Sequence, residues 1–278
     1  MLEAGLYQDN SFITLTYTDD SMPNLSSDGC YENIPTLDPA DLRNFIKRLR
    51  HQYHKQKGMR YFAVGEYGTK TFRPHYHAGL FDFYQCHNGQ TIQHFRTKRR
   101  LWKECCDTCR MVGNTWGLGD IEVRKLDTSK CEYLGGYITK KMTKKEDARL
   151  LGRHPEFSRQ SKQEGGIGFP ALAEMVKIIE RYAPDLIDVP DRIQTGKDKS
   201  RPLGRYLRQK LREAIGRDPR CPDIKIQELY VETMFPLLLA SKTDPAAPSL
   251  KAQIIKASQP YAERLKFQRE LYERNKTL

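Results

Sequence analysis

The sequence predicts an α+β fold, in which helices pack on an antiparallel sheet and a mostly helical C-terminal region follows. Short segments rich in Phe, Ile, Val, Tyr and Thr alternate with segments whose apolar residues recur at helical spacing. Two of the strand-like segments are joined by a short polar connection, which favours antiparallel neighbours. Beyond about residue 146 the pattern becomes mainly helical. We therefore expect a catalytic domain over residues 1–162 and a helical accessory region over residues 163–278.

The first elements are expected to be a strand, a helix and two paired strands. The segment 11–20, "SFITLTYTDD", reads as a strand closed by an Asp-Asp turn. A helix is predicted over 37–56, with Asp38 as N-cap and a proline in the first turn. Its apolar positions recur every 3.6 residues: Leu42, Phe45, Ile46, Leu49 and Tyr53. The next strands are predicted over 59–68 and 75–83.

The following elements are predicted from weaker patterns. A helix is expected within 97–106, then a turn-rich stretch over 113–119 and a strand over 120–126. A further helix is expected over 129–145, with Ser129 as N-cap and Glu132 completing a capping box. A basic, glycine-bearing loop occupies 153–170. Helical stretches then follow near 170–182, 201–215, 224–240 and 249–275.

Charge and hydropathy narrow the class of partner. The 278-residue chain has 47 Lys and Arg against 35 Asp and Glu, a formal net charge of +12. This excess favours an anionic partner such as nucleic acid, although charge alone does not separate a phosphate backbone from an acidic protein. No apolar run approaches the length of a membrane span, and "MLEAGLYQDN" lacks the basic and hydrophobic regions of a signal peptide. We therefore expect neither a membrane segment nor export.

The cysteines are expected to be reduced. The chain has seven, an odd number, and no secretion signal, which is not the pattern of a disulfide framework. Four of them lie in one stretch: Cys86, Cys105, Cys106 and Cys109. Only the last two have the C-x2-C spacing of a zinc knuckle, and no second matching pair follows. The sequence thus favours reduced thiols over a structural zinc ion.

The stretch "RPHYHAGLF" at 73–81 places two histidines on one face of a strand. His75 and His77 are two residues apart, so their side chains point the same way and can offer nitrogens to one divalent cation. Taken alone, the pair is more simply two histidines on the solvent face of a half-buried strand. Glu66, on the neighbouring strand, can approach both across the ladder, although a turn-edge carboxylate is an equal alternative. Two histidines and one carboxylate would leave metal positions open for a substrate oxygen.

Paired tyrosines and lysines follow on the helix predicted over 129–145. Tyr133 and Tyr137 are four residues apart, so both hydroxyls would face one direction; without the histidines, an aromatic stripe in the core would be preferred. The lysines after them could neutralise phosphates, or merely solubilise the helix end and complement its dipole: Lys140, Lys141, Lys144 and Lys145. Metal triad, tyrosines and lysines together indicate a nuclease with a tyrosine nucleophile.

Two glycines, Gly135 and Gly136, separate the tyrosines, and each costs a helix interior about 1 kcal/mol relative to alanine. Three explanations stay open at this point. The glycines allow the helix to move between two strand-transfer states, they allow DNA to approach closely, or they are a plain local weakness of the helix.

These motifs resemble a known family. "RPHYH" followed by a helix with "YLGGYITKK" is similar to the HUH endonucleases. The wider set "FITLTY", "FIKRLR", "YFAVGEYGTKTFRPHYHAGLF" and "EYLGGYITKKMTKK" resembles the rolling-circle replication initiators of microviruses, the gokushovirus type in particular. The resemblance spans roughly residues 10–168. It implies an HUH catalytic core built on an RRM-like sheet.

The resemblance also implies roles for the candidate residues. His75 and His77 would bind Mg or Mn, with Glu66 as the third ligand. Tyr133 and Tyr137 would alternate as nucleophile and rejoining group, giving a 5′-phosphotyrosine intermediate and a free 3′-hydroxyl.

The four lysines would have two roles. Lys140 matches the helix lysine of the family, and we expect Lys141, Lys144 and Lys145 to contact DNA. The implied function is a site-specific nickase and strand transferase that starts and ends rolling-circle replication at a single-stranded DNA origin, in the cytoplasm of a bacterial host. A host helicase or polymerase is a candidate partner. A plasmid or transposon nickase, or a non-catalytic origin-binding protein from a decayed prophage, are the alternatives.

Overall fold

The computed structural model describes residues 1–25, 34–53, 58–68, 70–86, 103, 105–136, 144–196, 199–243 and 246–275. The chain divides into two compact units, Met1–Met175 with Gln194–Ser200, and Val176–Ile193 with Arg201–Leu278. The functional boundary expected after residue 162 stays a prediction. Among the helices in these ranges, none combines the length and apolarity that crossing a bilayer requires.

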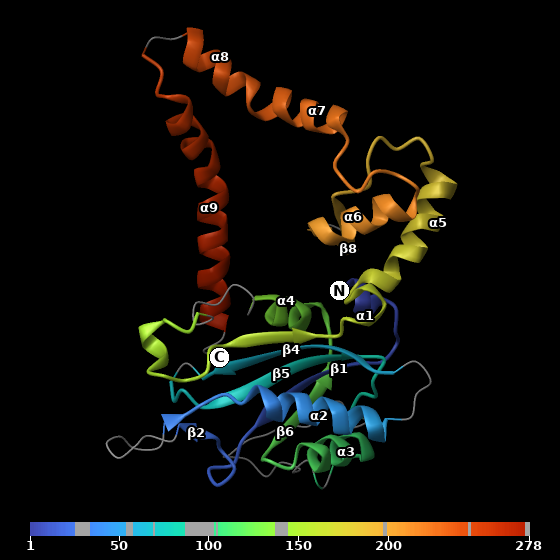
Figure 1. The fold of residues 1–278 in the computed structure, drawn as a ribbon, viewed down its shortest axis with the longest axis vertical. Helices are drawn as coiled ribbons and strands as arrows, with labels where there is room; N and C mark the ends of the chain where they lie inside the picture. Colours follow the sequence, from blue (N-terminus) through green and yellow to red (C-terminus); the bar gives the residue numbers. More distant parts are fainter. Residues whose placement is uncertain are drawn as a thin grey trace. The chain divides into compact units, whose positions relative to one another are not determined.

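A five-stranded antiparallel sheet forms the centre of the first unit (Figure 1). Its strands are β1 (Asn10–Thr16), β4 (Arg60–Tyr67), β5 (Pro74–Phe81), β6 (Ile121–Lys125) and β7 (Phe157–Gln160). They lie in the order β6-β1-β5-β4-β7, and every neighbouring pair is antiparallel. The strand with the two histidines is therefore central, and the predicted α+β class is confirmed.

Helices cover both faces of this sheet. α2 (Pro39–Gln52) and α3 (Asp107–Trp116) pack on one face, and α4 (Thr128–Gly136) lies over the other (Figure 1). The larger core lies on the α2 and α3 side, because alternate residues such as Leu15 and Tyr76 point there. The smaller one lies beneath α4.

The second helix follows the sequence closely at its start. Asp38 accepts a hydrogen bond from the backbone N–H of Ala40 at 2.7 Å, and Pro39 occupies the first helical position, as predicted. The helix ends at Gln52, four residues before the predicted end, because Tyr53 is already extended. The predicted continuation at 54–56 lies outside the described residues.

α4 begins differently from the prediction. Its first turn is capped by Asp127, whose Oδ1 accepts the Lys130 N–H at 2.9 Å. Ser129 lies inside the helix and donates its hydroxyl to Asp127 at 2.8 Å, so the predicted capping box with Glu132 is wrong. The carboxylate is the stronger acceptor for the unpaired N–H groups of a first turn.

The end of this helix also departs from the expected 129–145. The helix is described as far as Gly136, and residues 137–143 lie outside the described residues. Lys144 and Lys145 lie in an exposed turn and not on a helix.

Two further boundaries correct the sequence prediction. α3 begins at Asp107, after the expected 97–106, most of which lies outside the described residues. It extends to Trp116, through the first part of the predicted turn, and stops at Gly117, whose φ of 70° is left-handed.

The loop expected at 153–170 contains a strand. β7 pairs with β4, with Phe157 opposite Gly65 and Gln160 opposite Phe62. Phe157 packs its ring against Tyr76, with centroids 6.3 Å apart, while the remaining residues of the strand are exposed. Their polar character is typical of an edge strand, which is why the segment resembles a loop in sequence.

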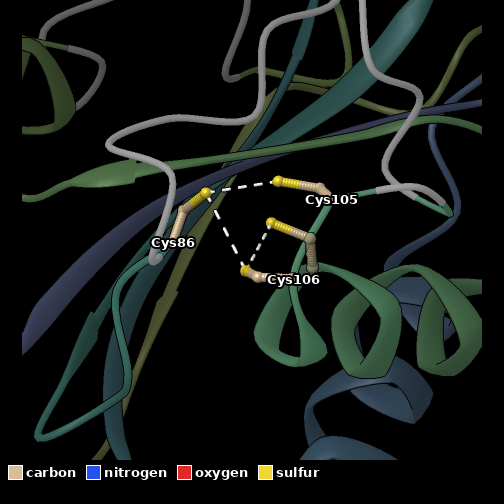
Figure 2. A group of neighbouring side chains, drawn as sticks. Cys86, Cys105 and Cys106 are labelled. Atoms are coloured by element: carbon tan, nitrogen blue, oxygen red, sulfur yellow. Dashed lines mark hydrogen bonds between the residues drawn. The ribbon is translucent and has the colours of Figure 1, made fainter.

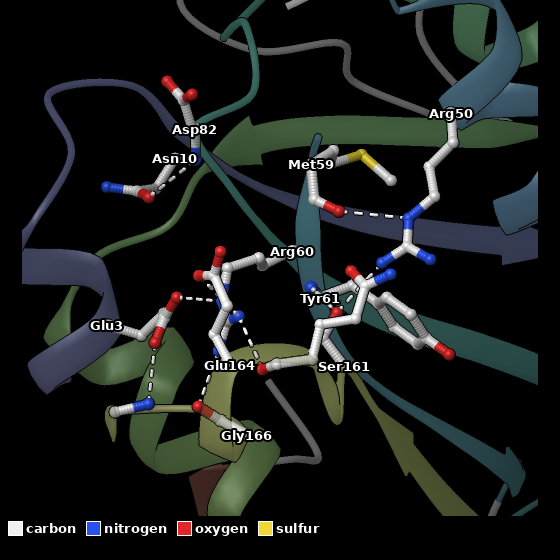
Figure 3. Close-up of polar contacts among 12 residues, drawn as sticks. Glu3, Asn10, Arg50, Met59, Arg60, Tyr61, Asp82, Ser161, Glu164 and Gly166 are labelled. Atoms are coloured by element: carbon white, nitrogen blue, oxygen red, sulfur yellow. Dashed lines mark hydrogen bonds and ion pairs between the residues drawn. The ribbon is translucent and has the colours of Figure 1, made fainter. Parts of the chain in front are cut away.

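A buried ion pair ties the N-terminus and the segment after β7 to β4 (Figure 3). In α1 (Leu2–Gly5), Glu3 Oε1 lies 2.5 Å from Arg60 Nε, and both side chains are almost fully buried. Arg60 also donates to the carbonyls of Gln163 and Gly166, while Glu3 accepts the Gly168 N–H at 2.6 Å. The start of the predicted accessory region thus packs on the sheet.

The remaining elements are short strands and the expected C-terminal helices. The helices are α5 (Leu172–Tyr182), α6 (Arg205–Ala214), α7 (Asp223–Thr233), α8 (Phe235–Thr243) and α9 (Leu250–Asn275). The short strands form two-stranded sheets: β2 (Asn24–Leu25) with β3 (Ile34–Pro35), and β8 (Arg192–Gly196) with β9 (Lys199–Pro202). The helix predicted over 224–240 is two helices, because a break at Met234 precedes the proline in α8. In the second unit, Asp188 makes a two-pronged ion pair with Arg212 at 2.6 and 2.7 Å.

Candidate metal and tyrosine site

The register of β4 and β5 brings three candidate ligands together. Glu66 lies directly opposite His75 in the ladder, and His77 follows two residues later on the same face. Glu66 is 1% exposed and His77 7% exposed, whereas His75 lies nearer the strand end and is half-buried. This is the juxtaposition expected from the alternation of strand side chains.

Both imidazoles point the same nitrogen at one carboxylate oxygen. Nε2 of His75 lies 2.7 Å from Glu66 Oε1, and Nε2 of His77 lies 3.1 Å from it. The other ring nitrogens are held from behind: Nδ1 of His75 lies 3.2 Å from the Arg73 carbonyl, and Nδ1 of His77 lies 3.1 Å from Thr14 Oγ1. Such backing contacts fix the orientation of histidines that bind metals.

The hydrogen bonds of His75 call for a positive charge in this cluster. A carbonyl only accepts, so Nδ1 of His75 carries the hydrogen that it donates to Arg73. Nε2 of a neutral ring would then point a lone pair at Glu66. Burial raises the pKa of Glu66, but hydrogen bonds and charge from His75 and His77 outweigh it and lower the pKa overall. Either a second proton on the imidazole or a divalent cation satisfies these groups.

The donor set fits a divalent metal ion. One ligand atom from each of Glu66, His75 and His77 lies within 4.8 Å of the others. Imidazole and carboxylate together suit first-row divalent cations, and three protein ligands leave positions for substrate oxygens. The residues present therefore match the metal that the sequence suggested, without distinguishing Mg from Mn.

Tyr133 reaches this cluster from α4. Its hydroxyl lies 3.2 Å from His77 Nε2 and 3.4 Å from Glu66 Oε1. The ring meets His77 edge-on, with centroids 5.2 Å apart, and Phe12 of β1 stacks on the other side of the same imidazole. One tyrosine hydroxyl is thus beside the candidate metal ligands.

A glycine lets the helix approach this closely. Gly79 lies two residues after His77 on the same strand face, and Leu134 of α4 packs over it. A Cβ at Gly79 would lie 3.0 Å from Leu134 Cδ1 and 3.3 Å from Leu126 Cδ2. The absence of a side chain at Gly79 therefore contributes to the position of Tyr133.

The other predicted site residues stand apart or outside. Tyr137, Lys140 and Lys141 lie outside the described residues. Lys144 and Lys145 are exposed, and their contact with DNA stays a prediction.

Sequence reasoning missed two residues that hold His77, namely Thr14 and Phe12. Both belong to the "FITLTY" strand. Their alternation was visible in sequence, but their pairing with β5 was not, because the two strands are about sixty residues apart.

Comparison with known proteins identifies the family of this segment. Residues 10–146 match the family model of the replication-associated protein ORF2. The chain is 31% identical over 169 residues to the replication-associated protein ORF2 of Spiroplasma virus 4, covering 59% of this chain and 48% of that protein. It is 30% identical over 151 residues to the replication-associated protein VP4 of Bdellovibrio phage phiMH2K, covering 52% and 43%.

A third relative gives the same picture. The replication-associated protein ORF4 of Chlamydia phage 1 is 30% identical over 142 residues, which cover 50% of this chain and 33% of that protein. The matched segment therefore spans less than half of each of these relatives. No solved structure matches the chain significantly. Through the segment from residue 10 to residue 146, which holds the histidines, Glu66 and Tyr133, the chain belongs to the replication-associated protein ORF2 family.

Proposed function

We propose that this protein is a metal-dependent tyrosine endonuclease that nicks single-stranded DNA at an origin and rejoins it during rolling-circle replication of a phage. The observation that carries the proposal is the position of the Tyr133 hydroxyl, 3.2 Å from His77 and 3.4 Å from Glu66. A nucleophile beside two imidazoles and a carboxylate is what phosphoryl transfer to tyrosine requires. The names of the phage relatives support the replication role.

The proposed cleavage is a transesterification. The Tyr133 oxygen forms a bond to phosphorus, and the bond between phosphorus and the 3′ oxygen breaks. The phenolic proton passes to Glu66 or to water, and the departing 3′ oxygen takes a proton from water to become a free 3′-hydroxyl. The product keeps a 5′-phosphotyrosine bond of similar energy to the broken diester, so a 3′-hydroxyl can reverse the step.

Several residues of the chain prepare this step. His75, His77 and Glu66 would hold a divalent cation, which when bound withdraws charge from the scissile phosphate and lowers the barrier to attack by a phenol of ordinary pKa near 10. Thr14 and the Arg73 carbonyl keep the two rings turned toward the site. Phe12 restricts His77 by stacking at 5.4 Å.

The second tyrosine completes the proposed cycle. Tyr137 is four residues after Tyr133 in the sequence, and we propose that one tyrosine cuts while the other resolves the covalent intermediate. Lys140 would stabilise charge near the phosphate, and Lys141, Lys144 and Lys145 would contact the DNA backbone.

The test is formation of a covalent adduct. Purified protein is incubated with labelled single-stranded oligonucleotides that tile the source genome, with Mn or with EDTA, and resolved on a denaturing gel. We expect a metal-dependent protein-linked band from one oligonucleotide set. Tyr133→Phe with Tyr137→Phe should remove the band while DNA binding persists. DNA binding without any adduct across the full set would contradict the nuclease and favour an origin-binding protein.

A further inference from the structure

A second group of metal-binding side chains lies away from the tyrosine site. Cys86 follows the end of β5, Cys105 and Cys106 precede α3, and Cys109 is in the first turn of that helix (Figure 2). Their four sulfur atoms lie within 4.8 Å of one another. Three of the separations are 3.5 Å for Cys86 to Cys105, 3.9 Å for Cys86 to Cys106, and 3.6 Å for Cys106 to Cys109.

These separations match a tetrahedral zinc site. With Zn–S bonds of about 2.3 Å, a regular tetrahedron of thiolates has sulfur atoms about 3.8 Å apart. A disulfide requires about 2.05 Å, so none of the three measured pairs is one. Two thiols in van der Waals contact would have a similar separation. The inference therefore rests on four sulfur atoms from two chain segments meeting around one point.

The surroundings suit a closed structural site. Cys86, Cys106 and Cys109 are buried and Cys105 is half-buried, within the core between the sheet and α2 and α3. Cys106 occupies the N-cap of α3 in an extended conformation, and Cys109 is the third helical residue. The positive end of a helix dipole stabilises thiolates, the form in which cysteine binds metal.

We propose that Cys86, Cys105, Cys106 and Cys109 hold one structural zinc ion. Four thiolates in a tetrahedron select zinc or iron, and a closed four-ligand site leaves no position for a substrate. An iron–sulfur cluster would place iron and sulfide between the cysteines and hold their sulfur atoms further apart. The proposal is independent of the proposed nuclease, because the cysteines pack on the face of the sheet opposite Tyr133.

The ion would join the end of the histidine strand to the start of α3. Cys86 and Cys105 are separated by eighteen residues in the sequence, and a metal bridge between them lowers the entropy of the unfolded chain. The C-x2-C pair alone was too weak a sequence signal, because the other two ligands come from a strand end and from the residue adjacent to the pair.

The test is elemental analysis of the full-length protein, purified under reducing conditions without chelator. We expect one zinc per chain in the wild type. Cys109→Ser should lower the zinc content to near zero, while Cys221→Ser, in the second unit, should leave it unchanged. His75→Ala with His77→Ala should also keep the zinc, which separates this site from the candidate nuclease site.

Cobalt substitution tests the ligands without a variant, in case Cys109→Ser does not fold. Metal-free wild type titrated with Co²⁺ should develop intense near-ultraviolet thiolate-to-cobalt absorption and the visible bands of a tetrahedral ion, saturating at one equivalent and bleaching with Zn²⁺. Zinc absent from the purified protein together with no cobalt thiolate absorption would overturn the proposal. So would iron in place of zinc, or zinc lost from the histidine variant and kept in Cys109→Ser.

Discussion

The Tyr133 hydroxyl lies 3.2 Å from Nε2 of His77, although the two residues belong to different elements and are far apart in the sequence. The contact depends on how closely α4 approaches β5. Leu134, next to Tyr133, packs over Gly79, two residues beyond His77. The spacing of nucleophile and metal ligand is thus set partly by a position with no side chain.

Gly79→Ala should therefore weaken cleavage more than it weakens the fold. The added Cβ would lie 3.0 Å from Leu134, so the helix must give by a few tenths of an ångström. Since a misplacement of 1 Å can cost about 100-fold in rate, we expect adduct formation to slow roughly tenfold. Overpacking should cost about 1–3 kcal/mol of stability. Single-turnover adduct kinetics and urea unfolding measure the two effects.

Gly5→Ala serves as the matched control for this variant. A Cβ at Gly5 meets nothing within 4 Å, so adduct formation and stability should stay near wild type. An unchanged adduct rate in Gly79→Ala would show that helix position is not limiting.

Gly135→Ala should stabilise the tyrosine helix. The glycine is exposed, a Cβ there meets nothing within 4 Å, and its φ is not left-handed. Alanine is favoured over glycine in a helix by about 1 kcal/mol, so the free energy of unfolding should rise by up to that amount, with cleavage unchanged. Urea unfolding measures stability, and paired cleavage and rejoining assays measure function. Selective slowing of rejoining would instead point to a hinge between the tyrosines.

Asp127→Ala should destabilise the start of the same helix. Asp127 accepts the Lys130 N–H at 2.9 Å, and losing such a cap costs about 1 kcal/mol. We expect slower adduct formation, because α4 carries Tyr133. Asp127→Asn, which can still accept the N–H, should keep most of the stability at pH 7.

The contribution of Asp127 should depend on pH. Burial raises the pKa of Asp127, but hydrogen bonds from Lys130 and Ser129 outweigh it and lower the pKa to about 2, below its ordinary value near 4. A lowered folded-state pKa stabilises the protein above the unfolded pKa, and this contribution is lost as the pH falls from about 4 to about 2. The stability difference between wild type and Asp127→Asn should therefore shrink over that window. A constant difference would place the interaction elsewhere.

The sequence predicted the parts of the site that depend on local periodicity. His75 and His77 share a face because strands alternate, and Glu66 meets them because a short connection makes the two strands antiparallel. The cap at Asp127 was missed because Ser129 with Glu132 matched a common motif two residues too late. β7 was missed because an edge strand needs few apolar residues.

Long-range packing accounts for the remaining misses. The contact of Glu3 with Arg60, and the backing of His77 by Thr14, depend on segments that meet only in the folded chain. Nothing in local spacing indicates these partners. The cysteine group was set aside for the same reason, because Cys86 is brought to α3 by the sheet and not by a sequence motif.

Thr14→Val should show whether the orientation of His77 matters for activity. Thr14 Oγ1 lies 3.1 Å from Nδ1 of His77, and valine keeps the shape of threonine while removing the hydroxyl. Loss of a group that orients a metal ligand typically costs about 10- to 100-fold in metal affinity or activity, so we expect adduct formation to need more Mn. Thr14→Ser, which keeps the hydroxyl, should restore the metal requirement to near that of wild type. The measurement is adduct yield against Mn concentration. Equal curves for Thr14→Val and Thr14→Ser would mean that Phe12 stacking alone orients the ring.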